Sequence, residues 1–167
     1  MKMLIDSDSL IKLTKIGAKK VVATNIDVYM PPKVRDETIT ASKKEGYSDA
    51  FLIEENLNKG LLKVKESKGD QYTEEMIEQL NLAGGEADIF RVYRAHDFDA
   101  ISSDDGRFLS ILDELDLPYL TPSSVIVNLY YREIIDEEES KGFMERLKEI
   151  VSEEEYYLAM DSIGGKR

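Results

Sequence analysis

Short apolar runs alternate along this chain with longer segments whose apolar residues have helical spacing. Residues 2–5 form an apolar run that ends at Asp6, and Leu10 and Leu13 then continue at helical spacing until Gly17. Such a run is typical of a buried strand, and such spacing is typical of an amphipathic helix. The pattern predicts strands at residues 2–5, 61–64, 98–101 and 118–120, with brief extended pieces at residues 21–24 and 28–30.

Helices are predicted between and after these strands. Some have recognisable ends, such as the Pro31-Pro32 pair before one helix and Gly46 after it. Strands that alternate with helices form a mainly parallel sheet covered on both faces, with functional residues at the carboxyl ends of the strands. The sequence therefore predicts an α/β fold with a parallel sheet of about four to five strands. The predicted helices span residues 7–16, 32–45, 48–58, 73–82, 86–95, 108–115, 123–131, 137–151 and 153–163.

The composition narrows the kinds of site that the chain can hold. An apolar fraction of 42% and a mean hydropathy of -0.37 indicate a soluble globular protein. The apolar stretch near Met1 is far shorter than a signal-peptide core or a membrane span, so we expect a cytoplasmic protein with no membrane partner. With no cysteine and one histidine, disulfides, thiolate zinc sites and histidine-rich metal sites are excluded. Any bound metal must be held by oxygen.

The net charge of -12 is concentrated in the second half of the chain. Residues 1–70 contain 13 basic and 11 acidic side chains, whereas residues 71–167 contain 9 and 23. Proteins bind nucleic-acid phosphates through Lys and Arg, so we expect RNA to approach the first half, where Lys12 and Lys15 follow the first acidic segment. An ordinary solvated helix surface would explain the same lysines.

Carboxylates stand beside apolar elements in four separate segments of the chain. Asp6 follows the first strand, Glu37 lies inside a helix, Glu86 begins a helix, and Asp104 and Asp105 follow a later strand. Taken singly, Asp6 is also explained as a helix cap and Glu37 as a solvated group. If they converge, their repulsion requires a cation, and hard Mg²⁺ or Mn²⁺ suits an all-oxygen site.

These segments resemble the four acidic motifs of the PIN-domain family, in their usual order, and the resemblance covers residues 1–125. That family consists largely of metal-dependent ribonucleases, including the VapC toxins of toxin–antitoxin pairs, and its fold is a parallel sheet between helices. The segments are Leu4-Ile5-Asp6-Ser7-Asp8-Ser9-Leu10-Ile11, Pro31-Pro32-Lys33-Val34-Arg35-Asp36-Glu37, Gly85-Glu86-Ala87-Asp88 and Ile101-Ser102-Ser103-Asp104-Asp105.

The resemblance implies that Asp6, Glu37, Glu86 and Asp104 are the catalytic acids and hold Mg²⁺ or Mn²⁺, with Asp105 as a further ligand. Asp104 is preferred because it is nearer the strand, while Asp105 stands three residues before an aromatic residue as in some relatives. Small neutral residues are commoner than an acid at the position of Asp8. The implied activity is endoribonucleolytic hydrolysis, in which water attacks the phosphorus in line and the 3′ oxygen leaves.

The resemblance also sets expectations for domains and partners. Residues 1–125 are expected to form the PIN-like catalytic domain, and residues 126–167 a helical C-terminal extension packed on the same domain. RNA is the expected substrate, a homodimer the expected assembly, and an antitoxin protein the expected partner if the chain is a toxin.

Two other functions remain open from the sequence. The acidic second half favours a non-catalytic PIN-like module that binds RNA or protein, and activity lost on metal removal would separate the enzyme from it. The Asp6-Ser7-Asp8 sequence after a strand also resembles the nucleophile segment of haloacid-dehalogenase-like phosphatases. That alternative leaves Glu37 and Glu86 unexplained.

Overall fold

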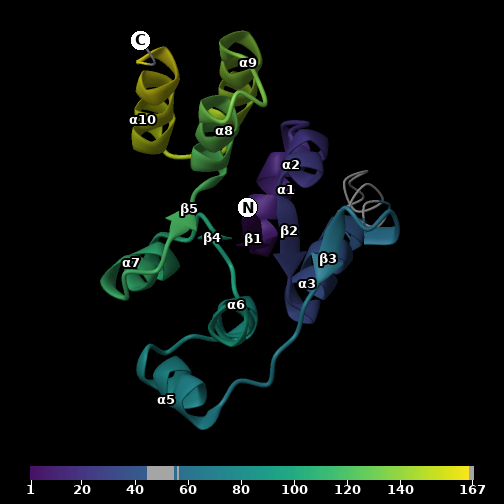
Figure 1. Cartoon of the computed structure of the whole chain (residues 1–167), viewed down its shortest axis with the longest axis vertical. Coiled ribbons are helices and arrows are strands. Elements are labelled where there is room, and N and C mark those ends of the chain that lie inside the picture. Colours follow the sequence, from purple (N-terminus) through teal and green to yellow (C-terminus); the bar gives the residue numbers. More distant parts are fainter. Residues whose placement is uncertain (45–54, 56, 166–167) are drawn as a thin grey trace.

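A parallel sheet organises the chain in the computed structural model, which describes residues 1–44, 55 and 57–165. Among these residues, five strands form one sheet in the order β3-β2-β1-β4-β5, with every neighbouring pair parallel (Figure 1). The predicted α/β fold and strand number are confirmed. The strands are β1 (Lys2–Ile5), β2 (Asp27–Met30), β3 (Leu62–Val64), β4 (Ala100–Ser102) and β5 (Tyr119–Leu120).

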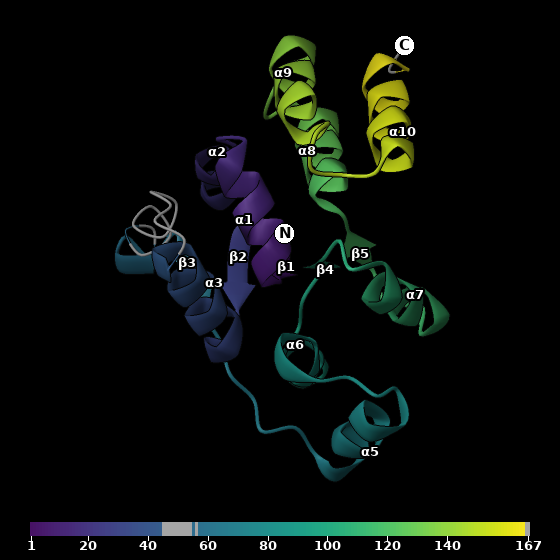
Figure 2. The ribbon, with the colours of Figure 1, turned by 180° about the vertical axis from the view of Figure 1, so that it is seen from behind.

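Helices cover both faces of this sheet, as parallel strands require. Helices α5 and α6 lie on one side of the strands, and α1, α2 and α8 to α10 lie on the other (Figures 1 and 2). The helices are α1 (Ser7–Lys15), α2 (Lys19–Asn25), α3 (Pro32–Lys44), α5 (Gln71–Gln79), α6 (Gly84–Ala95), α7 (Gly106–Glu114), α8 (Pro122–Tyr131), α9 (Glu137–Leu147) and α10 (Glu153–Gly164).

The central strand β1 explains why the first apolar run is uninterrupted. Met3, Leu4 and Ile5 have no exposed surface, because helices cover both faces of the sheet at this point. Ile5 pairs with Ser102 of β4, and the next backbone N–H, that of Asp6, donates to the Ser102 carbonyl at 3.0 Å. Asp6 is therefore held at the carboxyl edge of the sheet.

Residues 21–24 were predicted to be extended, and this prediction is wrong, because they belong to helix α2. Val22 and Ala23 are buried, and the N–H of Val22 donates to the carbonyl of Ala18 at 3.0 Å. Packing of this apolar face overrides the extended preference of adjacent β-branched residues. The predicted helix at residues 48–58 and its neighbour Gly46 lie largely outside the described residues.

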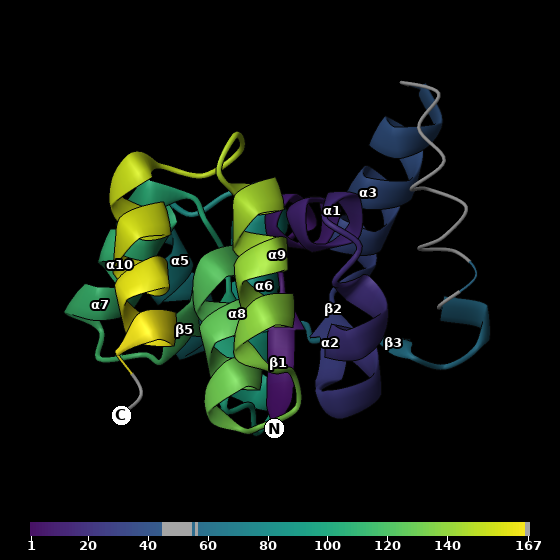
Figure 3. The same ribbon diagram turned by 90° about the horizontal axis from the view of Figure 1, so that it is seen from above.

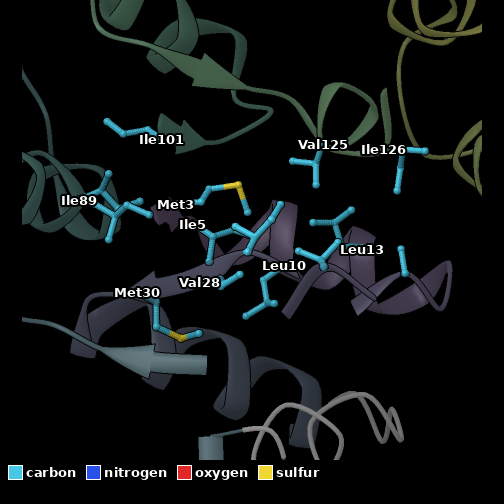
Figure 4. Close-up of a cluster of buried hydrophobic side chains, with 14 of the residues drawn as sticks. Met3, Ile5, Leu10, Leu13, Val28, Met30, Ile89, Ile101, Val125 and Ile126 are labelled. Atoms are coloured by element: carbon cyan, nitrogen blue, oxygen red, sulfur yellow. The ribbon is translucent and has the colours of Figure 1, made fainter. Parts of the chain in front are cut away.

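The C-terminal helices share the core of the sheet. Val125 and Ile126 stand on either side of the predicted domain boundary, and both lie in the buried cluster that also holds Leu13 of α1 (Figure 4). Helices α8, α9 and α10 pack on one another, and α8 also packs on α1, whereas α10 lies on the side away from α1 and α2 (Figure 3). Arg146 of α9 donates from Nε to the Ile16 carbonyl at 2.7 Å. In the described part of the chain, no helix is long and apolar enough to cross a membrane.

Candidate active site

Four of the five predicted acids line one pocket at the carboxyl edge of the sheet. The pocket has a volume of about 320 Å³, and its acids come from four separate segments of the chain. This convergence follows from the topology, because β1 and β4 are neighbours and their carboxyl ends meet at one edge. The lining residues are Asp6, Ser7, Asp8, Val34, Glu37, Ala83, Gly85, Glu86 and Asp105.

Asp6 is both the cap of helix α1 and a wall of this pocket. Its Oδ1 accepts a hydrogen bond from the backbone N–H of Ser9 at 2.8 Å. Burial raises the pKa of the Asp6 carboxyl group, and hydrogen bonds from Ser103 and Ser9 and the charge of Asp8 have smaller effects on it. The cap therefore fixes the position of a carboxylate whose charge is costly until a cation neutralises it.

Asp105, and not Asp104, lines the pocket with the other acids. Asp105 caps helix α7 by accepting from the N–H of Phe108 at 2.8 Å, and its own N–H donates to Oγ of Ser103 at 3.2 Å. The carboxylate of Asp104 instead forms an ion pair with Lys12 and lines a separate groove of about 1080 Å³. The two consecutive side chains thus line different cavities. Asp104 lies apart from the other predicted acids, which line the smaller pocket.

The pair with Asp104 also changes the interpretation of Lys12. Its side chain is only 24% exposed and its ammonium group is already neutralised. Lys12 is therefore not the freely solvated cation that its place in the sequence indicated.

Glu37 extends from α3 into the pocket and passes close to Gly85, which has no side chain. Oγ of Ser7 donates to Glu37 Oε2 at 3.5 Å, and Nζ of Lys33 lies 3.9 Å from Oε1. A Cβ atom added at Gly85 would lie 3.2 Å from Glu37 Oε2 and 3.5 Å from a methyl carbon of Val34. The absence of a side chain at Gly85 leaves room for the Glu37 carboxylate.

Glu86 enters from the first turn of α6 and is paired with Arg107 of α7. Nη1 of Arg107 lies 3.2 Å from Glu86 Oε2. Nη2 of Arg107 donates to the carbonyls of Leu80 and Asn81 at 2.9 and 2.8 Å. No sequence motif indicated this arginine, because its partners lie more than twenty residues away along the chain.

The donor set of the pocket suits a hard divalent cation. Its titratable side chains are all carboxylates, and oxygen ligands are those that Mg²⁺ and Mn²⁺ prefer. Within the described residues, no three acidic or histidine side chains are gathered closely enough to hold a metal as they stand. Glu37 and Glu86 have exposed side-chain fractions of 42% and 27%, so both side chains are accessible to a cation from solvent.

Comparison with known families identifies the fold. A family model described as DUF3368, a PIN domain, matches residues 2–162, which is nearly the whole chain. The comparison with curated proteins gave no match, and neither did the comparison with solved structures. PIN domains are generally nucleases and typically use divalent metals, in keeping with the carboxylates of the pocket. With the family model matching from the first strand into the last helix, this chain belongs to the PIN-domain family.

Proposed function

We propose that this PIN-domain chain is an endoribonuclease that hydrolyses RNA phosphodiester bonds with Mg²⁺ or Mn²⁺. The observation that carries the proposal is the convergence of Asp6, Glu37, Glu86 and Asp105 on one pocket of about 320 Å³. Four carboxylates brought together without a cation repel one another, and this repulsion costs stability. A purely structural role therefore does not explain four acids from four segments at one edge of the sheet.

In this proposal, the four acids divide into two kinds. Asp6 and Asp105 are held in place by helix-capping hydrogen bonds, so they would present fixed oxygens to the cation. Glu37 and Glu86 extend from α3 and α6 and would complete the donor set. When bound, a divalent cation polarises the phosphodiester and lowers the pKa of a water molecule, so no covalent intermediate is needed. Asp104 is replaced by Asp105 as the proposed fourth acid, because Asp104 is paired with Lys12.

Cleavage of single-stranded RNA by the purified chain tests this proposal. Cleavage should require Mg²⁺ or Mn²⁺ and should stop in chelator. Asp6→Asn and Asp105→Asn should lower the rate by about 100-fold or more, since metal catalysis commonly supplies several kcal/mol. Asp70→Asn is the matched control, because Asp70 caps α5 with the same hydrogen bond and lies outside the pocket. Equal cleavage in chelator, or full activity in Asp6→Asn, would refute the proposal.

A non-catalytic binding module is the second candidate. It is favoured by one observation, that no three potential ligands in the described residues are already at metal-binding distances. This candidate predicts that the chain binds RNA in Mg²⁺ and in Mn²⁺ but leaves it intact, and that the four acid variants bind RNA as well as the parent. Cleavage that depends on the ion and on Asp6 would exclude it.

For the biological setting, we propose a toxin of a toxin–antitoxin pair, on the basis of the resemblance of the acidic motifs to the VapC toxins. Expression of the chain alone in a bacterial host should then arrest growth, and Asp6→Asn should abolish the arrest. A small protein encoded in the neighbouring reading frame should restore growth when expressed together with the parent chain. Growth unaffected by an active, expressed nuclease would instead favour RNA processing.

A further inference from the structure

Two cations from different helices contact the acids of the pocket. Lys33 of α3 lies 3.9 Å from Glu37, and Arg107 of α7 lies 3.2 Å from Glu86. We call Lys33 and Arg107 the rim cations. Their side chains are 52% and 50% exposed, so each is open to solvent while it neutralises a pocket acid.

The charges of the pocket make these contacts exchangeable. A divalent cation bound by the carboxylates would compete with Lys33 and Arg107 for the same oxygens, because both interactions use the negative charge of Glu37 and Glu86. Once displaced, Arg107 would stay near the pocket, since its Nη2 is also held by the carbonyls of Leu80 and Asn81. A guanidinium group in that position is suited to a phosphate oxygen.

The larger groove, which Asp104 lines, is a poor path for a polyanion. It is lined by Glu149, Glu154 and Glu155. Of the described residues that line this groove, only Lys12 is a cation, and Lys12 is paired with Asp104. Phosphates would therefore be repelled from the groove, whereas cations are available beside the smaller pocket.

We infer that Lys33 and Arg107 are exchangeable counterions of the active-site acids. They neutralise Glu37 and Glu86 in the metal-free pocket, and they bind phosphates of single-stranded RNA when a divalent cation takes their place. This inference rests on the proposed nuclease function and adds the path of the RNA, which crosses the pocket beside α3 and α7 and avoids the larger groove.

Two affinities that change in opposite directions test the inference. Lys33→Gln should bind Mg²⁺ about twofold more tightly, because a helix pair of this exposed kind is worth a few tenths of a kcal/mol. The same variant should bind RNA more weakly, and the slope of log K against log salt should fall by about 0.7 for one lost phosphate contact. Arg107→Gln should show the same pair of changes, and Arg107→Lys should restore part of the RNA affinity.

Titration calorimetry measures Mg²⁺ binding. Fluorescence anisotropy measures binding of labelled single-stranded RNA in Ca²⁺, and a gel shows that the RNA stays intact. Lys141→Gln is the matched control, because Lys141 forms the same kind of exposed helix pair, with Glu137, on α9. Glu154→Gln reports on the larger groove and should leave RNA affinity unchanged. Lys33 makes no backbone contact comparable to that of Arg107 in the described structure, so its variant remains informative if Arg107→Gln is unstable.

Opposite changes in the two affinities, absent from Lys141→Gln, would support the inference. Parallel loss of both affinities would overturn it, because that result indicates a structural role. The inference would also be overturned if RNA affinity rose in Glu154→Gln by as much as it fell in Arg107→Gln. That result would place RNA in the larger groove. If the parent cuts RNA and the rim variants match Lys141→Gln, the inference fails and the nuclease function stands. A parent that neither binds the ion nor cuts RNA refutes the proposed function itself.

Discussion

Replacing Asp6 by asparagine should separate metal binding from folding, because the two depend on different properties of this side chain. The cap needs only an oxygen that accepts from the N–H of Ser9, and asparagine supplies one. The negative charge of Asp6 destabilises the metal-free fold, because burial raises the pKa of this carboxyl group in the folded protein. The contribution of such a group to stability is fully present below its unfolded-state pKa and is lost as the pH rises through the folded-state pKa. At neutral pH in chelator, Asp6→Asn should therefore melt at the same temperature as the parent or higher.

When the divalent cation is bound, the parent should melt at a higher temperature than Asp6→Asn. A ligand present at 100 times its Kd stabilises a protein by about 2.7 kcal/mol. For a chain of this size, that corresponds to a rise in Tm of about 5–11 °C. If the loss of one pocket carboxylate weakens the ion about tenfold, the same concentration contributes about 1.4 kcal/mol. Asp6→Asn should therefore show roughly half of the parent's shift or less.

Thermal melts in chelator and across a Mg²⁺ series measure both effects. Asp70→Asn is again the control, because Oδ1 of Asp70 accepts from the N–H of Thr73 at 2.7 Å in the same cap geometry. The pKa of Asp70 is lowered, chiefly by that backbone hydrogen bond, so its neutralisation should not stabilise the metal-free protein. Its Mg²⁺ shift should equal that of the parent.

Two results would refute this reasoning. Equal Mg²⁺ shifts in Asp6→Asn and the parent would show that the ion acts nonspecifically and not through the pocket. A Tm for Asp6→Asn in chelator well below that of Asp70→Asn would show that the charge of Asp6 stabilises the metal-free fold.

Three further variants test other parts of the structure. Gly85→Ala should raise Tm, because alanine is the better helix former by up to about 1 kcal/mol, yet weaken Mg²⁺ binding in calorimetry, because its Cβ crowds Glu37. Unchanged Mg²⁺ affinity would contradict the packing argument. Glu74→Gln should lower Tm at neutral pH by a few degrees, because a hydrogen bond from Arg91 lowers the pKa of Glu74. The difference in Tm between the variant and the parent should vanish as the pH falls through that lowered pKa. A deficit independent of pH would exclude a charge effect. Asp104→Asn should lose about 1–2 kcal/mol of stability in denaturant melts, because its lysine partner is left half-buried, and should keep its Mg²⁺ shift. Loss of that shift would return Asp104 to the metal site.

Much of the architecture could be predicted from the sequence because it depends on local patterns. Met3, Leu4 and Ile5 form an apolar run before Asp6 because β1 is covered on both faces at these positions, and its strand assignment needed no tertiary information. Alternation of strands and helices then implied a parallel sheet, and the carboxyl ends of its strands implied where Asp6 and a second acid after β4 would meet.

The errors and omissions arose where distant contacts decide the outcome. Val21 and Val22 favour a strand locally, but burial of one face of α2 makes them helical. The pairing of Asp104 with Lys12, while Asp105 lines the pocket, could not be predicted either, because Lys12 lies on another element; which of the two acids holds a metal stays a prediction.

The sequence by itself thus predicted acids at the carboxyl ends of β1 and β4, because strand ends and helix caps are set by neighbouring residues. Only the tertiary structure decided which carboxylates share a pocket and which cations neutralise them. The contact between Arg107 and Glu86 joins two helices through space, and such an ion pair depends on distances that no local pattern of residues specifies.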